Sequence, residues 1–161
     1  MSAPQHRAHW HQDDSPVVEL RQYTVHPGRR DALIAQFDGE LVDPMEALGM
    51  RILGQFRDAD DPARFVWLRG YPALAARAPL CAAFYDGAGW QARRAEVNAT
   101  LVDSDDVLLL APGDGCASPL LTPEPGEGDP GLVLLTTWAL PAPVDDDLAA
   151  RAPAVLARLG G

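Results

Sequence analysis

The alternation of apolar and polar residues predicts four β-strands before residue 113. In VVELRQYTV, residues 17–25, apolar and polar positions alternate up to a His-Pro-Gly stop, which is typical of a half-buried strand. MRILGQFR and RFVWLRGY lie on either side of the turn-forming DADDP, so the pair predicts a hairpin. The apolar segment DVLLLAP, residues 106–112, predicts the last strand.

Apolar residues at helical spacing predict helices between these strands. The spacing runs from about Arg30 to Leu48. Pro44 lies inside it, so we expect a kink or a restart near Asp43, and an end at Gly49.

Two shorter helices are expected near residues 72–85 and 90–100, on either side of a Gly-Ala-Gly turn, with Pro79 interrupting the first. We expect Trp90 to pack between these helices and the sheet, with a ligand contact as the alternative. The resulting order, β-α-β-β-α-β, predicts an α+β fold of the ferredoxin-like plan. In that plan an antiparallel sheet carries its helices on one face.

The composition changes along the chain and predicts four regions. Residues 1–15 are polar and lack periodicity, so we expect a disordered tail. Residues 16–112 form the ferredoxin-like domain, and the Pro- and Gly-rich, acidic residues 113–130 read as a linker. Residues 131–161 repeat the pattern of an apolar strand, a proline stop and an amphipathic helix. We therefore expect an incomplete second unit there.

Alternation also sorts the strand residues onto two faces of the sheet. We expect the more apolar set to pack against the helices: Val18, Leu20, Ile52, Phe56, Val66, Leu68, Val107 and Leu109. We expect the other set on the open face: Glu19, Arg21, Tyr23, Arg51, Leu53, Gln55, Phe65, Trp67, Arg69, Leu108 and Leu110. That mixture suits an interface or a wet cavity between two sheets.

The charge and the cysteine content exclude several classes of protein. A net charge of −10 argues against nucleic acid and anionic membrane surfaces as partners. No apolar run is long enough to span a membrane, and the first residues lack the apolar core of a secretory signal. Cys81 and Cys116 form neither a disulfide framework nor a metal-ligand spacing. We therefore expect a cytoplasmic protein.

The sequence offers no catalytic motif. The serines lack an elbow motif, and the glycines at residues 87–89 lack the spacing of a phosphate-binding loop. We interpret the three histidines of the tail as accidental, and Asp103, Asp105 and Asp106 as a solvated turn. No metal site and no cofactor are predicted.

Arginines and aromatic residues form the candidate ligand site. Four of them share the open face by alternation, and Arg51 lies nearby on the same face. Arginine forks between aromatic walls suit a planar or carboxylate-bearing small molecule. Two aromatic residues are expected at the rim of the site. The full set is Arg21, Tyr23, Arg51, Trp67, Arg69, Tyr85 and Trp90.

These segments resemble the NIPSNAP family, in the dimeric α+β barrel group. The resemblance runs from about Val17 to Pro112. It rests on the E-L-R-Q-Y-T strand before Pro-Gly, the F-V-W-L-R strand, and the F-Y…W stretch that ends in Asn-Ala-Thr. It implies a ferredoxin-like unit that pairs sheet to sheet, between chains or between tandem units of one chain. It implies no particular reaction.

We therefore expect a homodimer that associates through the open sheet face and holds a small aromatic or carboxylate ligand between the sheets. Two alternatives stay open. One is a cofactor-free monooxygenase- or isomerase-like enzyme acting on an aromatic substrate. The other is a module that only binds proteins. An enzyme of this shape needs a titratable group inside the barrel, and Glu19 is the candidate.

Overall fold

The computed structural model describes residues 15–111 and 133–137. The chain divides into two units, one of Met1–Pro112 with Ala117–Thr122 and the other of Gly113–Cys116 with Pro123–Gly161. Residues 1–14, the expected linker and most of the expected second unit lie outside the described residues. Residues 133–137 of the second unit form neither helix nor strand.

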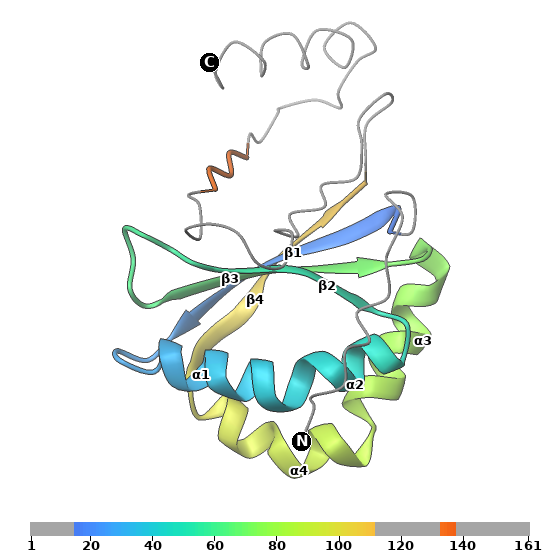
Figure 1. Cartoon of the computed structure of the whole chain (residues 1–161), viewed down its shortest axis with the longest axis horizontal. Coiled ribbons are helices and arrows are strands. Elements are labelled where there is room, and N and C mark those ends of the chain that lie inside the picture. Colours follow the sequence, from blue (N-terminus) through green and yellow to red (C-terminus); the bar gives the residue numbers. More distant parts are fainter. Residues whose placement is uncertain (1–14, 112–132, 138–161) are drawn as a thin grey trace, which may run out of the picture. The chain divides into compact units, whose positions relative to one another are not determined.

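The described domain has the α+β, ferredoxin-like order that the sequence predicts. Its elements are β1 (Val17–Val25), α1 (Arg30–Gln36), the π-helical turn η1 (Phe37–Leu41), α2 (Val42–Ala47), β2 (Arg51–Arg57), β3 (Arg64–Tyr71), α3 (Leu74–Tyr85), α4 (Ala88–Asn98) and β4 (Leu101–Leu110). The strands form one antiparallel sheet in the order β2-β3-β1-β4. All the helices lie on the same side of this sheet (Figure 1). Among these helices, none combines the length and apolar character that a membrane crossing requires.

The first long helix is irregular, as its proline predicts. A π-helical turn separates α1 from α2, and the Val42 N–H donates to the Phe37 carbonyl, one residue further back than in an α-helix. Pro44 follows within the first turn of α2 and has no N–H to continue the ladder. Gly49 ends the segment at φ 98°, a left-handed conformation that favours glycine. Its N–H donates to the Glu46 carbonyl.

The second helical region differs from the prediction in two respects. α4 begins at Ala88, so two residues of the expected Gly-Ala-Gly turn belong to the helix. Pro79 does not interrupt α3, which runs unbroken from Leu74 to Tyr85. Asp86 and Gly87 then make the reversal into α4. A side chain at Gly87 would approach the Ala83 carbonyl oxygen to 3.0 Å, so the close turn favours glycine.

The predicted faces of the two central strands, β1 and β3, are wrong. Tyr23, Phe65 and Trp67 are buried in one cluster with the helix residues Leu33 and Phe37. They therefore face the helices. The alternate residues of the same strands form a separate cluster on the opposite face, which is called the outer face below. This cluster contains Val18, Leu20, Leu53 and Leu68, with Phe56, Val66 and Leu110 packed against it.

The edge strand β2 contains a register shift, so simple alternation does not predict the faces of all its residues. The register between β2 and β3 shifts between Ile52 and Gly54, so Ile52 faces the helices as predicted and Leu53 faces outward. After the shift, Gln55 faces the helices and donates to Asp38 of the π-helical turn. Phe56 then faces outward, against the prediction.

The edge strand β4 is longer than the sequence predicts. It begins at Leu101 and includes the acidic residues that were expected to form a turn. Asp106 lies opposite Gln22 of β1, whose amide donates to it. Val107 and Leu109 pair with Arg21 and Glu19, so they lie on the helix-facing side as predicted. Leu108 pairs with Leu20 and lies on the outer face, as predicted.

Candidate functional site

A buried carboxylate lies at the centre of the helix-facing side of the sheet. Glu19 is the third residue of β1, directly opposite Arg69 on β3, and two residues from Arg21 on the same strand. Its side chain is fully buried. A buried carboxylate needs partners that replace its lost hydration, and the sequence supplies them on adjoining positions of the same face.

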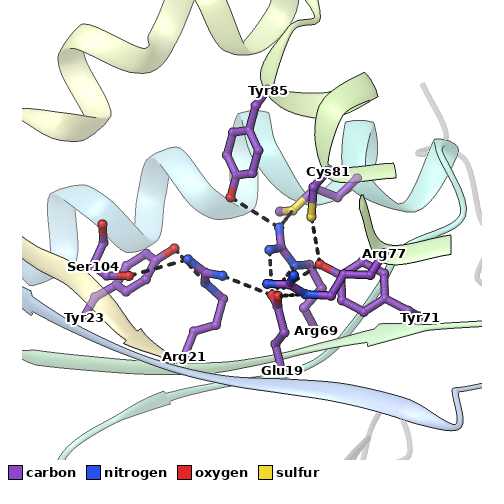
Figure 2. Close-up of polar contacts among 10 residues, drawn as sticks. Glu19, Arg21, Tyr23, Arg69, Tyr71, Arg77, Cys81, Tyr85 and Ser104 are labelled. Carbon is purple, nitrogen blue, oxygen red and sulfur yellow. Dashed lines mark hydrogen bonds and ion pairs between the residues drawn. The ribbon is translucent and has the colours of Figure 1, made fainter. Parts of the chain in front are cut away.

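Arg69 is the main partner of this carboxylate. Its Nε and Nη2 lie 3.0 and 2.6 Å from Oε2 of Glu19. Its guanidinium carbon also lies 5.2 Å from the centre of the Trp67 ring and 5.9 Å from that of Tyr85. The Tyr85 hydroxyl reaches down from the end of α3 and accepts from Arg69 Nη1 at 3.4 Å (Figure 2). Arg69 is therefore fixed by one charge and by the aromatic rings around it.

Arg21 joins the carboxylate to an aromatic wall. Its Nη1 lies 3.0 Å from Oε2 of Glu19, and its Nε donates to the Tyr23 hydroxyl at 3.0 Å. Nη2 is 3.5 Å from the Ser104 carbonyl of β4. The guanidinium carbon lies over both Tyr23 and Trp67, at 5.3 and 5.4 Å from the ring centres. The side chain is 12% exposed, so Arg21 is a buried cation held at the edge of the cluster.

The other end of the cluster comes from α3. Arg77 donates from Nε to Oε1 of Glu19 at 2.6 Å and stays 40% exposed. The Tyr71 hydroxyl is 3.2 Å from Oε2 of Glu19 and 3.1 Å from Sγ of Cys81 (Figure 2). An ionised carboxylate can only accept hydrogen bonds, so the Tyr71 hydroxyl donates its hydrogen bond to Glu19. The Cys81 S–H then donates a hydrogen bond to the Tyr71 oxygen.

These contacts set the charge states in the cluster. Burial by itself raises the pKa of the Glu19 carboxyl, but the charge and hydrogen bonds of Arg69, with help from Arg21 and Arg77, lower it overall from 4.5 to about 2. Burial raises the pKa of Tyr71 and of Tyr23. At neutral pH, Glu19 is therefore an anion, and both tyrosines are neutral hydrogen-bonding groups.

A cavity of about 90 Å³ lies beside Arg21, between the sheet and the helices, and is called the inner cavity below. Its lining combines aromatic rings, apolar side chains and a few polar groups. The lining residues are Arg21, Tyr23, Phe37, Leu41, Met45, Trp67, Phe84, Tyr85, Trp90, Val97, Asn98, Leu101 and Ser104. Phe37 and Leu41 belong to the π-helical turn, which places both side chains against the cavity. Asn98 is exposed, so the cavity reaches the surface there.

The structure brings most of the predicted ligand residues together, on the other side of the sheet from the one expected. The residues Arg21, Tyr23, Trp67, Tyr85 and Trp90 all line the inner cavity. Arg69 lies behind them, between Glu19 and Tyr85. Arg51 does not join them, because it pairs with Gly70 and lies on the outer face.

Two further parts of the prediction need correction. Arg21 and Arg69 were expected on the open face, where a second sheet would cover them, whereas both lie on the helix-facing side and meet Glu19 within one chain. Arg77 and Tyr71 were not predicted as members of the cluster. Arg77 belongs to the helix α3, and the pattern of residues in the strands does not show which helix residues lie over β1. Tyr71 continues the alternation of Trp67 and Arg69 along β3, so the strand pattern did contain a signal for it.

Trp90 packs between the two helices as expected, and its contact with a ligand stays a prediction. Its ring lies 5.6 Å from Phe84 and 5.2 Å from Tyr85, so it packs the end of α3 against α4. It also lines the inner cavity.

Comparison with known proteins identifies the family of this domain. Residues 18–114, more than half of the chain, match the family model described as NIPSNAP. The chain belongs to the NIPSNAP family. No curated protein resembles it closely enough to count as a match. The NIPSNAP match covers the strands and helices that build the inner cavity.

Solved NIPSNAP structures share the fold. An uncharacterized NIPSNAP domain protein from Burkholderia xenovorans is 19% identical, with a TM-score of 0.57 over 62% of this chain and 97% of that chain. A NIPSNAP family protein from Agrobacterium tumefaciens C58 is 23% identical, with a TM-score of 0.56 over 62% and 87% of the two chains. A NIPSNAP-like domain protein from B. xenovorans is 25% identical, with a TM-score of 0.55 over 71% and 95%.

Proposed function

We propose that this NIPSNAP domain binds a small molecule in the inner cavity, between its sheet and its helices. The observation that supports the proposal is the gathering of Arg21, Trp67 and Trp90 around one cavity that opens at Asn98. Binding sites for small molecules are concave, mostly apolar or aromatic, and contain a few fixed polar groups. The ion pair with Glu19 fixes Arg21, which is the charged group in the cavity lining.

The volume limits the ligand. A cavity of about 90 Å³ is smaller than the roughly 150 Å³ cavity known to hold benzene in another protein. A short polar molecule fits without any change. An aromatic ligand requires Tyr85 and Trp90, the half-buried rings at the end of α3 and the start of α4, to move apart.

A test of binding follows the indole N–H resonance of Trp67 while small probes of different chemistry are added. Propionate, propionamide and phenol cover an anion, a neutral amide and an aromatic ring. At least one probe is expected to shift the Trp67 signal with a saturable curve. Val97→Phe, which fills the cavity, is expected to abolish the shift, whereas Val66→Phe on the outer face is expected to preserve it. No shift with any probe in the folded protein would overturn the proposal.

We also propose that the domain forms a homodimer through the outer face of the sheet. The apolar cluster of this face extends to Leu108 on the edge strand β4, which is 38% exposed. Within the described residues, β4 pairs on one side only. Val18, Leu20, Leu53 and Leu68 are at most 5% exposed within one chain. A second copy would therefore cover the exposed Leu108 and the unpaired edge of β4.

Light scattering tests the dimer. Leu108→Glu is expected to shift the protein toward monomer, because it places a charge on the interface. Leu74→Glu on α3 is the control. It introduces the same charge at a leucine that is 59% exposed and lies away from the outer face, so it is expected to leave the mass unchanged. A monomer mass for the unmodified protein at micromolar concentration would overturn the proposal and would favour another part of the chain as the cover.

Two observations weigh against Glu19 as the general base of the enzyme alternative. A general base works best with a pKa near the operating pH, whereas the pKa of Glu19 is lowered to about 2. Its Oε2 also accepts from Arg69, Arg21 and Tyr71. Glu19 therefore acts as the counter-ion that fixes the arginines.

A further inference from the structure

Within the described part of the chain, three residues that line the inner cavity carry a hydrogen-bond donor without an acceptor. The indole Nε1–H of Trp67 is buried and has no hydrogen-bond partner. Tyr23 and Tyr85 accept bonds from Arg21 and Arg69, and within residues 15–111 neither hydroxyl proton has an acceptor. A buried donor without an acceptor is rare, because it loses its hydration without compensation.

The cavity lining contains few free hydrogen-bond acceptors by comparison. The Ser104 carbonyl already receives Arg21 Nη2, although at the long distance of 3.5 Å. Asn98 contributes a mixed donor and acceptor at the surface end. A ligand that only accepts hydrogen bonds satisfies this lining, and a ligand that mainly donates does not.

The charges of the buried cluster point to the same class of ligand. Arg69 and Arg21 are 1% and 12% exposed, and Glu19 is the carboxylate between them. Arg77 adds a third guanidinium to Glu19 from a more exposed position. Two buried cations therefore share one buried anion, which leaves a positive charge beside the cavity. Buried charges in proteins are normally paired, since desolvation is costly.

We propose that the inner cavity binds a carboxylate group, with Arg21 as its charge partner and Trp67 Nε1–H as a directed donor. The inference rests on the proposed function, because it names the chemical class that the same cavity selects. The volume of about 90 Å³ accommodates acetate or propionate. A longer acid fits with its carboxylate inside and its chain leaving past Asn98.

Matched pairs of acids and amides test the inference. Titration calorimetry and the Trp67 indole resonance compare propionate with propionamide, and hexanoate with hexanamide, at constant ionic strength. Each acid is expected to bind at least about 10-fold more tightly than its amide. If hexanoate binds more tightly than propionate, the ligand is a longer molecule that ends in a carboxylate. If propionate binds more tightly, the ligand is a short acid.

Variants separate the roles of the two donors. Arg21→Gln is expected to remove most of the preference for acid over amide. Because it also breaks the contact with Glu19, Trp67→Phe provides a second variant, which keeps an aromatic ring but removes the free N–H together with the five-membered part of the indole. It is expected to weaken acid binding about 3- to 10-fold, measured by calorimetry in the folded variant. Arg57→Gln, at an exposed ion pair with Asp31, is the control and is expected to change nothing.

The outcomes distinguish the two proposals. Equal affinity for acid and amide overturns the carboxylate inference and leaves small-molecule binding intact. Acid binding that survives both Arg21→Gln and Trp67→Phe also overturns the inference, because it then arises elsewhere on the surface. No binding of any probe overturns both.

Discussion

Glu19 and Arg69 face each other directly across β1 and β3, and two nitrogens of Arg69 bind the same oxygen of Glu19, at 3.0 and 2.6 Å. The pair is shielded from solvent by the helices, with 1% and 0% of the side chains exposed. Arg21 and Arg77 complete the coordination from β1 and α3. The centre of this NIPSNAP domain is thus an ionic cluster inside an aromatic shell.

Removing the carboxylate charge is expected to be strongly destabilising. Glu19→Gln leaves Arg69 and Arg21 buried without a counter-ion, so we expect a loss of about 3–5 kcal/mol in the free energy of unfolding. Urea denaturation measures it. Asp31→Asn, at an ion pair whose side chains are 57% and 82% exposed, is the control and is expected to lose less than about 1 kcal/mol. A comparable small loss for Glu19→Gln would show that the cluster is not important for stability.

Stability is expected to fall in acid because of the same carboxylate. Its pKa is about 2 in the folded protein against 4.5 ordinarily. A lowered pKa contributes stability that is complete above the unfolded value and is lost as pH falls toward the folded one. The free energy of unfolding should therefore drop between about pH 5 and pH 2, by up to about 1.4 kcal/mol per pH unit from this group. Measuring the wild type against Glu19→Gln isolates the contribution, and parallel pH curves for the two would contradict it.

The Tyr71 hydroxyl is expected to contribute more than the Tyr85 hydroxyl. Tyr71 is fully buried and bonds both Glu19 and Cys81, whereas Tyr85 is half-buried and accepts one bond of 3.4 Å from Arg69. Tyr71→Phe should cost about 1–3 kcal/mol, since it removes a hydrogen bond to a charged group. Tyr85→Phe should cost less than half as much in the same denaturation experiment. The opposite order would mean that Tyr85, and not Tyr71, anchors the cluster.

Trp90 is expected to act mainly as a packing residue between the two final helices. Its ring contacts Phe84 and Tyr85 and is only partly buried, so Trp90→Ala should lose about 2 kcal/mol, less than the 3–5 kcal/mol of a fully buried aromatic. Thermal or denaturant unfolding measures the loss. A value below about 1 kcal/mol would instead favour a role limited to ligand contact.

Local sequence pattern was enough to predict the order of the elements and the family. Alternation marked the strands, and the glycine and proline positions marked most of their ends. Gly49 was predicted as the end of a helix, and it adopts the left-handed conformation that this role requires. These features depend on neighbouring residues along the chain, which is why local pattern is enough to recognise them.

The face of the central strands that the helices cover depends on long-range packing. Alternation places Glu19, Arg21 and Tyr23 on one face but does not say whether that face is buried. The rule that the more apolar face is covered failed, because Arg69 and Arg77 reach Glu19 from another strand and from a helix and neutralise its charge. A polar face can be buried when its charges find partners, and those partners are set by long-range packing that no local sequence pattern contains.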